Sequence, residues 1–408
     1  MAESAGSARG NVGAVLVVFA AAGLAMGQTV ARVPALRDAV GATTAELGLA
    51  LMGMGVGSLL AMPFTGRLVD RFGSRAVVTT AVLLACSGYA TLAAVPSVAA
   101  LLATLVVTGT AVGVWDVAMN IQASHVERHR DRAWMPYFHA AFSFGAVLGS
   151  GAGALAAWQG VGLVQLPVLA GTTAVVAVVA LRRFVREEHQ PGPDRASAQA
   201  ETEARPGPVR AGLTRLEVLI GLVCLAAALA EGAANDWLAL LLVDVQGAPP
   251  AFGALTLTAF NVTMTIGRVL GGPATDRLGR AGVVRVGGVL AVVGILVLTL
   301  VHSLPLAIVG GLLWGLGIST VFPAAMSAAG EVPGRGNRAI TVVSTIAYGA
   351  FLFGAPTIGL LAEQVGLDRA LLLVVAFLAL MVLLAPVMTV RAARTSGRPR
   401  SPSGRMVT

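Results

Sequence analysis

Long apolar segments alternate with short polar connections along the whole chain. Each apolar segment holds about 20 residues, which is the length that an α-helix needs to cross the hydrocarbon core of a bilayer. The pattern predicts twelve transmembrane helices, in two sets of six that are separated by a polar segment. We expect these helices at roughly 12–33, 44–66, 75–95, 98–121, 136–158, 161–184, 215–241, 250–272, 281–301, 304–326, 337–362 and 368–390.

The polar segment at 185–213 mixes alternating charges with prolines, which predicts a flexible cytoplasmic loop instead of a folded domain. We therefore predict an all-α integral membrane fold with two pseudo-symmetric six-helix bundles. The first bundle covers 1–184 and the second covers 214–390, and a disordered cytoplasmic tail is expected at 391–408.

Composition excludes a soluble globular domain, because 12% of the residues are charged and 56% are hydrophobic. A soluble domain carries about 25% charged residues. The net charge of +8 is the difference between 28 basic residues, all of them arginine, and 20 acidic residues. If the N-terminus is cytoplasmic, 25 of the arginines lie in inner connections and tails. Only Arg32, Arg37 and Arg369 lie outside. This asymmetry predicts a multi-pass cell-membrane protein with both termini in the cytoplasm, and it explains the basic balance without nucleic acid.

Glycine pairs spaced four residues apart occur within three of the expected helices. In a bilayer such pairs let two helix backbones approach closely. We interpret them as packing faces within a bundle and not as dimerisation sites. The pairs are Gly53 with Gly57, Gly109 with Gly113, and Gly145 with Gly149.

A charged motif interrupts the apolar pattern twice, at the same place in each half. Residues 66–75 read G-R-L-V-D-R-F-G-S-R and end in Arg75, and residues 272–280 read G-P-A-T-D-R-L-G-R. The equivalent residues are 206 positions apart, about half of the 408-residue chain, which indicates a duplicated unit. We expect the glycines to ease a tight turn and the arginines to hold it at the cytoplasmic side. The pairs are Gly66 with Gly272, Asp70 with Asp276, Arg71 with Arg277, and Gly73 with Gly279.

With this motif in both halves, the chain resembles the major facilitator superfamily of secondary transporters over essentially its whole length. The resemblance implies two six-helix bundles around a central cavity that opens alternately to each side. It also implies a gating role for Asp70, which would bond toward residues 337–338 when the cavity faces outward. The alternative is that Asp70 merely neutralises Arg71 or Arg75.

A narrower resemblance concerns two further segments. Residues 115–127 (W-D-V-A-M-N-I-Q-A-S-H-V-E) and 139–145 (H-A-A-F-S-F-G) are similar to the bacterial fucose-permease-like carriers. The antiporter signature of drug exporters, a glycine series ending in Gly-Pro on the fifth helix, is not matched. This difference makes drug efflux the less favoured function.

Carboxylates inside apolar segments are costly unless they are paired or hydrated, and an unpaired one tends to take up a proton. Glu231 on the seventh expected helix is therefore the best candidate for proton coupling, with Asn235 one turn away on the same face. The alternative is a carboxylate satisfied by a hydroxyl or an arginine of a neighbouring helix. Asp236 lies nearer the outer end, where solvation explains it more simply.

In the fourth expected helix, Asp116 and Asn120 share a stripe with Gly109 and Gly113. This stripe would face the cavity, although Asp116 could instead pair with an arginine of an inner loop. His139 on the fifth helix could relay protons or simply lie in water at the interface.

The remaining candidates are single polar side chains. Arg32 could attract anionic solutes or pair with Asp38 or Glu46. A pocket lining is expected from Asn261, Trp314 and Tyr348, which lie within the eighth, tenth and eleventh helices. Arg268, one turn before Gly272, is assigned to the gate and not to the pocket.

The chain contains no ATP-binding P-loop, no HExxH zinc motif and no GxSxG nucleophile elbow. We therefore expect no enzyme, no cofactor and no metal site. The predicted function is a secondary transporter that moves a small polar solute across the membrane by alternating access, coupled to protons. The missing antiporter signature favours uptake by a symport permease, although the sequence does not fix the direction of transport. Export of a drug-like compound or secreted metabolite is the first alternative, and a sensor or scaffold that binds without transport is the second. A monomer in the lipid bilayer would suffice.

Overall fold

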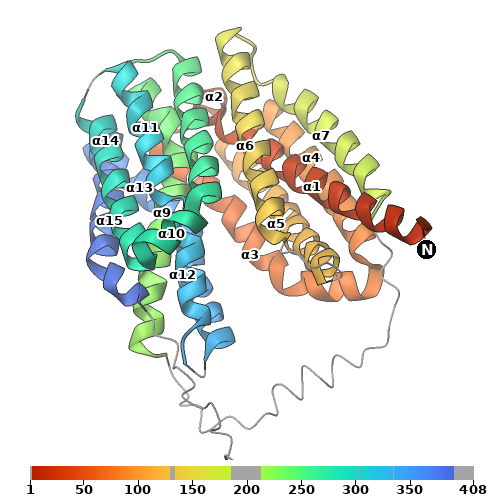
Figure 1. Ribbon diagram of the computed structural model, residues 1–408. Coiled ribbons are helices and arrows are strands. Elements are labelled where there is room, and N and C mark those ends of the chain that lie inside the picture. The colour runs from red at the N-terminus through yellow and green to blue at the C-terminus, as the bar shows by residue number, and fades with distance from the viewer. Residues whose placement is uncertain (1, 129–133, 185–212, 302, 334, 390–408) are drawn as a thin grey trace, which may run out of the picture.

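The computed structural model describes residues 2–128, 134–184, 213–301, 303–333 and 335–389. The predicted tail at 391–408 and all but the last residue of the predicted loop at 185–213 lie outside this part of the chain. Helices and short connections make up the described residues (Figure 1). The first half contains α1 (Ala2–Val30), α2 (Val33–Val40), α3 (Thr44–Phe72), α4 (Ser74–Thr91), η1 (Leu92–Ala94), α5 (Val98–Arg128), α6 (Met135–Trp158) and α7 (Gln165–Leu181). The second half contains α9 (Arg215–Asp244), α10 (Pro250–Leu300), α11 (Leu304–Ile318), α12 (Val321–Gly330), α13 (Gly336–Val365), α14 (Leu367–Ala370), α15 (Leu372–Leu384) and η2 (Ala385–Met388).

Ten helical stretches within the described residues are long and apolar enough to cross a membrane. One of them, α10, has 51 residues and is broken at Gly279, so that it provides two crossings. A further apolar helix, α7, has 17 residues. Counted in this way, the helices agree with the twelve that the hydropathy pattern predicts.

The two motif copies adopt the same backbone turn. Gly73 has φ 78° and ψ 149°, and Gly279 has φ 68° and ψ 164°. A residue with a side chain rarely adopts such a positive φ, so glycine is required at both positions. Gly66 and Gly272 differ from the expectation, because they lie inside α3 and α10, about two turns before the break, and their backbone is helical.

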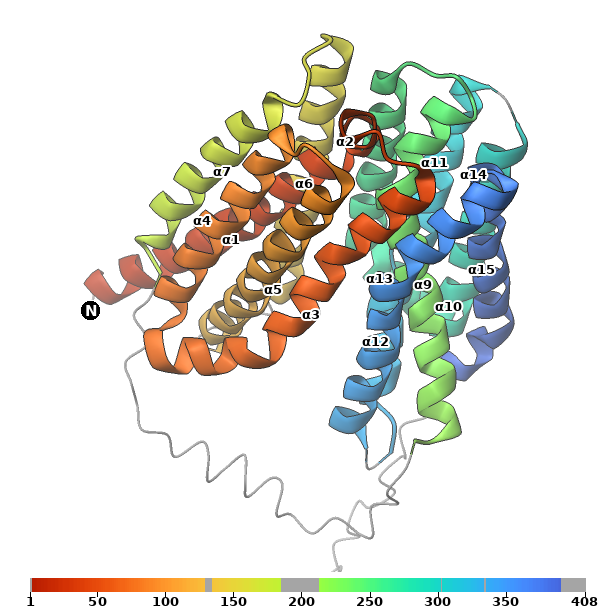
Figure 2. The same cartoon turned by 180° about the vertical axis from the view of Figure 1, so that it is seen from behind.

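The helices form two groups, with α1 to α7 in one half and α9 to α15 in the other (Figures 1 and 2). Across the boundary, α3 packs along α13 and α6 packs along α10. We call the end of the molecule with the Gly73 turn and the start of α9 the predicted inner face. The opposite end, with α2 and the connection from α9 to α10, is the predicted outer face. Toward the predicted inner face, α3 and α12 diverge (Figure 2).

Small residues bring helices of the same half into backbone contact. A Cβ atom added to Gly145 of α6 would lie 2.0 Å from the carbonyl oxygen of Ala20 on α1. A Cβ atom on Gly109 of α5 would lie 2.2 Å from the carbonyl oxygen of Met54 on α3. The glycine pairs are therefore packing faces within the first bundle, as predicted.

We expect Gly145→Ala to destabilise the folded protein, because the new methyl group would collide with the backbone of α1. Overpacking of this kind costs about 1–3 kcal/mol, which should lower the apparent melting temperature in detergent by several degrees. The matched control is Gly171→Ala on α7, where an added Cβ meets no atom within 4 Å. Equal melting temperatures for the two variants would contradict this account of the α1–α6 contact.

Candidate functional site

A small cleft lies where α1, α6, α9 and α10 meet, so both halves of the chain contribute to it. Its lining combines polar and apolar side chains. The polar lining residues are Ser143, Glu231, Asn235, Asn261 and Arg268. The others are Met26, Gly27, Val30, Phe142, Ala146 and Met264.

The cleft contains an ion pair between Arg268 of α10 and Glu231 of α9. The Nη2 atom of Arg268 lies 3.1 Å and 3.3 Å from the two carboxylate oxygens of Glu231. Its Nη1 atom donates a hydrogen bond of 3.0 Å to the hydroxyl of Ser143 on α6. The side chains of the pair are 29% and 30% exposed, so a solute in the cleft can reach them. One guanidinium therefore connects the acid of its own half with the hydroxyl of the other half.

The position of Arg268 differs from the sequence-based assignment to the gate. Side chains on an α-helix tilt toward its N-terminus, and α10 begins at the predicted outer face. The long side chain of Arg268 therefore extends away from the motif at Gly272 and into the cleft, where it reaches Glu231. For Glu231, the structure matches the alternative in which an arginine of a neighbouring helix satisfies the carboxylate.

The two asparagines expected near the pocket do line the cleft. Asn235 lies one turn beyond Glu231 on α9 and is buried. Asn261 donates through Nδ2 to the carbonyl oxygen of Leu257, 3.1 Å away. This bond uses one of the two hydrogens of the Asn261 amide, so the side chain can make further hydrogen bonds.

Trp314 does not line the cleft, contrary to the sequence-based expectation. Its side chain is completely buried within the second half, where its ring packs edge-on against Phe260 with 5.8 Å between centroids. Residues of α11 pack closely on α10, so the indole fills the helix interface instead of the space between the halves. Its Nε1 atom has no protein partner among the described residues.

Four further candidates lie outside the lining of this cleft, on α5, α6 and α13. Asp116 and Asn120 share one face of α5, as predicted, and the Asn120 amide donates to the Asp116 carboxylate at 3.2 Å. His139 packs its ring edge-on against Phe19 at 5.5 Å. Tyr348 is 37% exposed and packs against Phe351.

Arg32 has a structural position that neither sequence-based alternative anticipated. It is 5% exposed, and its Nη2 atom donates 2.8 Å to the carbonyl oxygen of Val161 in the connection from α6 to α7. The proposed partners are used elsewhere, because Asp38 bonds to Arg37 and Glu46 caps α3 at Thr43. Arg32 thus holds the end of α1 within its own half.

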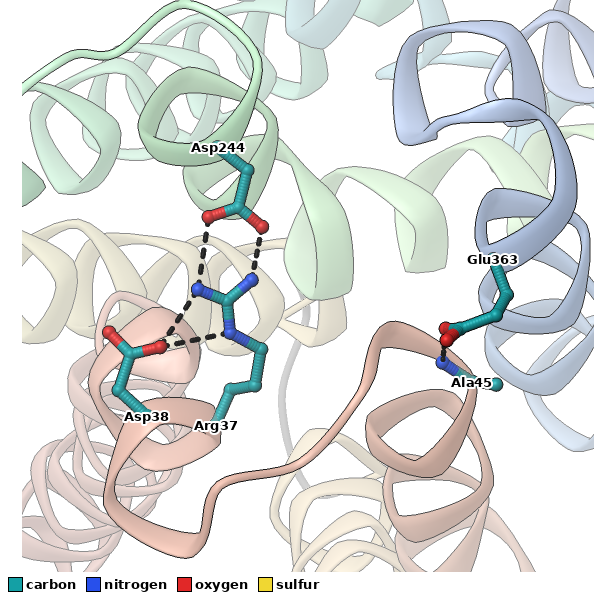
Figure 3. A network of polar contacts seen from close by, with 5 residues as sticks. All are labelled: Arg37, Asp38, Ala45, Asp244 and Glu363. Atoms are coloured by element: carbon teal, nitrogen blue, oxygen red, sulfur yellow. Dashed lines mark hydrogen bonds and ion pairs between the residues drawn. The ribbon is translucent and has the colours of Figure 1, made fainter.

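At the predicted outer face, polar contacts join the two halves (Figure 3). The guanidinium of Arg37 on α2 forms a two-point ion pair with Asp244 at the end of α9, with Nη2 3.0 Å from Oδ1. The backbone N–H of Ala45 donates 3.1 Å to Glu363 of α13. Burial alone would lower the pKa of Arg37, but the hydrogen bonds with Asp244 and Asp38 outweigh it and raise that pKa.

This outer network was missed as a site by sequence reasoning, although a signal was present. Arg37 is one of only three arginines that the charge pattern places outside. What the sequence could not show is that its partner comes from residue 244, more than 200 positions away.

At the predicted inner face, the motif carboxylates do not hold the halves together. Asp70 and Asp276 are exposed, and neither forms a side-chain bond within the described residues. The side chains at 337–338, where the resemblance implies a partner for Asp70, lie outside that part. The inner contact of Asp70 therefore stays a prediction for the opposite conformation.

Ion pairs near the second motif copy stay within the second half. Arg280 donates to Glu331 after α12, with 2.7 Å between Nη1 and Oε2, and this hydrogen bonding lowers the pKa of the Glu331 carboxyl. Arg335 pairs with Glu217 at 2.7 Å in the first turn of α9. Both pairs brace the inner ends of helices in one bundle.

Known proteins with similar sequences and structures are membrane transporters. An uncharacterized MFS-type transporter of Yersinia pestis is 34% identical, with 87% of this chain and 89% of the relative covered. A transporter of Sinorhizobium fredii is 35% identical, covering 90% and 95%, and the fosmidomycin resistance protein of Escherichia coli is 24% identical, covering 82% of each. Among solved structures, a mutant form of the nucleoside transporter NupG matches with a TM-score of 0.75 at 11% identity, covering 93% of this chain and 100% of that one.

These observations define a helical multi-pass membrane transporter. The sequence model of the Major Facilitator Superfamily matches residues 14–257 and 220–405. The chain therefore belongs to the major facilitator superfamily, as the duplicated motif indicated. The narrower fucose-permease-like resemblance is not supported by these relatives and stays a prediction.

We expect Asp244→Ala to weaken closure of the predicted outer face, because it leaves Arg37 without its partner from the other half. An accessible ion pair contributes about 0.5–1 kcal/mol, which is up to about fivefold in the open fraction. The measurement is the rate at which an impermeant maleimide, added to intact cells, labels Val30→Cys in the cleft. The two native cysteines, Cys86 and Cys224, are both buried.

Asp38→Ala is the matched control for this experiment. It removes another carboxylate from Arg37, but one that lies on the same helix and does not cross the boundary. If both variants raise the labelling rate equally, or neither changes it, the Arg37–Asp244 pair does not hold the outer face closed.

Proposed function

We propose that this protein is a secondary active transporter that moves a small polar solute across the cytoplasmic membrane by alternating access, coupled to protons. The observation that carries the proposal is the Arg268–Glu231 pair in a cleft built by both halves. Proton coupling requires a carboxylate that a proton can reach and neutralise, and Glu231 is such a group. Its partner Arg268 also contacts the other half, so a change at Glu231 can affect both halves.

The contacts between the halves support alternating access. At the predicted outer face, Arg37 and Glu363 are bonded across the boundary. At the predicted inner face, Asp70 is exposed and the helices diverge (Figure 2). This arrangement is what a conformation open to one side requires. The arginine distribution would make that side the cytoplasm, with both termini there.

Proton coupling would act through the partners of Arg268. When Glu231 is ionised, the pair is neutral and the guanidinium is occupied. When Glu231 takes up a proton, the carboxyl no longer binds the guanidinium as a counter-ion, and Arg268 is free for other partners. Because one chain builds all sides of the cleft, a monomer is sufficient for this cycle.

Export is the second candidate function. The relative that is named a fosmidomycin resistance protein favours it, since resistance is consistent with removal of a compound from the cell. The proposed pair could serve either direction, because it only links a solute to a proton. Transport against a pH gradient of known sign in vesicles would separate uptake from export.

We expect Glu231→Gln to abolish proton-driven accumulation while solute exchange continues, because the amide cannot take up and release a proton. A ligand-stabilisation screen of the purified protein would identify the solute, since binding raises the apparent melting temperature. Accumulation and counterflow would then be measured in proteoliposomes. The matched control is Asp236→Asn, another carboxylate of α9 that is absent from the cleft lining, which should retain accumulation.

Accumulation that survives Glu231→Gln would show that Glu231 is not the coupling group. Binding without counterflow in the unaltered protein would instead favour a sensor or scaffold over a transporter.

A further inference from the structure

The two members of the cleft ion pair differ in one respect that restricts what can bind there. A guanidinium keeps its proton at any physiological pH, whereas a carboxylate can be neutralised by one proton. The Arg268–Glu231 pair therefore has two accessible charge states. It is neutral when Glu231 is ionised, and it is positive when Glu231 is protonated. A state with Arg268 neutral and Glu231 negative is not available.

From this asymmetry we propose that the solute is an anion, such as a carboxylate or a phosphate group, which replaces Glu231 as the partner of Arg268. The proposal rests on the proposed function and deepens it by giving the substrate class. A cationic solute would have to bind Glu231 and leave the partly exposed Arg268 without its counter-ion in a membrane-spanning segment, which is unfavourable. An anion leaves Glu231 unpaired instead, and uptake of one proton removes that penalty.

The geometry around Arg268 fits an anion better than a second cation. Its Nη2 atom alone contacts both oxygens of Glu231, so the pair is not the two-nitrogen fork that holds a carboxylate most firmly. Within the part of the chain that the structure describes, its Nη1 atom donates only to the neutral hydroxyl of Ser143. An incoming anion could therefore take both nitrogens in the fork geometry and accept from the Ser143 hydroxyl as well.

The remainder of the cleft indicates what the anionic group is attached to. Asn235 and Asn261 supply amide groups near the pair, and Phe142 and Met264 supply apolar surface. A compact organic acid with an apolar or aromatic body matches this combination better than a bare inorganic ion does. Because Ser143 belongs to the first half and Arg268 to the second, the bound anion would contact both halves at once.

Other ionisable side chains on the helices of the two halves must be separated from the pair in any pH test. They are His139 on α6, Asp236 on α9, Tyr348 on α13 and Asp116 on α5. His139 is the one whose titration could imitate that of Glu231, because it lies close enough to Arg268 to be affected by its charge. A variant of His139 is therefore part of the experiment.

The experiment uses three probes of the same shape and different charge: phenylacetate, phenylacetamide and phenethylammonium, with inorganic phosphate as a fourth. Binding to the purified full chain is measured by thermal stabilisation and by calorimetry in buffers that differ in their ionisation enthalpy. We expect phenylacetate to stabilise the protein most. We also expect the protein to take up one proton from solution when phenylacetate binds. Its affinity should rise by at most about tenfold per unit fall in pH, between about pH 7.5 and pH 5.5, where the probe itself stays ionised.

Three variants assign the effect to the pair. Glu231→Gln imitates the protonated acid, so phenylacetate should bind without pH dependence and about tenfold more tightly than to the unaltered protein at the higher pH. The charge-neutral double variant Arg268→Gln, Glu231→Gln should fold without an unpaired charge and bind phenylacetate about 10- to 100-fold more weakly. His139→Gln should keep the pH dependence.

The proposal is overturned if phenethylammonium or phenylacetamide is the preferred probe, or if no anion in the set stabilises the protein. It is also overturned if the pH dependence disappears in His139→Gln and persists in Glu231→Gln. Failure of the transport function has a different signature. Anions would then bind as described but would not accumulate in proteoliposomes under a proton gradient.

Discussion

A charge inside an apolar environment is tolerated only when another group compensates it, and this constraint organises the centre of the molecule. Arg268 and Glu231 meet the constraint by pairing, and they do so where helices of both halves converge. The hydroxyl of Ser143 completes the arrangement from the first half. Each member of the pair therefore depends on the other for charge compensation. If protonation or a bound solute neutralises one of them, the other needs a new partner.

Small residues set how closely the helices pack, both within a half and between the halves. Within a half, glycines such as Gly145 and Gly109 bring helix backbones together so closely that not even a methyl group fits. Such contacts are tight, because protein interiors are packed at the density of crystals. The same close approach occurs between the halves near the start of α3, where a Cβ atom added to Gly48 would lie 2.6 Å from the carbonyl oxygen of Ala355 on α13. The halves are therefore closely packed toward the predicted outer face, whereas α3 and α12 diverge toward the predicted inner face (Figure 2).

The contacts at the predicted outer face are suited to breaking and forming again. Arg37 and Asp244 are partly exposed, with side-chain exposures of 17% and 29%. An ion pair that water can reach is worth about 1 kcal/mol or less, since water replaces the lost partner. The pair can therefore bias the closed state without locking it. A deeply buried pair in the same place would hold the halves together too strongly for a transport cycle.

The sequence by itself determined the helical membrane fold, the duplication, the superfamily and the turns at Gly73 and Gly279. These features are local, because hydropathy acts over about 20 residues and a positive φ acts at one residue. Only the tertiary structure decided which polar side chains meet. In the structure, Arg268 lies in the cleft and not at the gate, Trp314 is buried against Phe260, and Arg32 donates to the carbonyl oxygen of Val161. The partner of a long side chain and the face that a helix turns inward both depend on the neighbouring helices. The hydropathy pattern along the chain does not show which helices are neighbours.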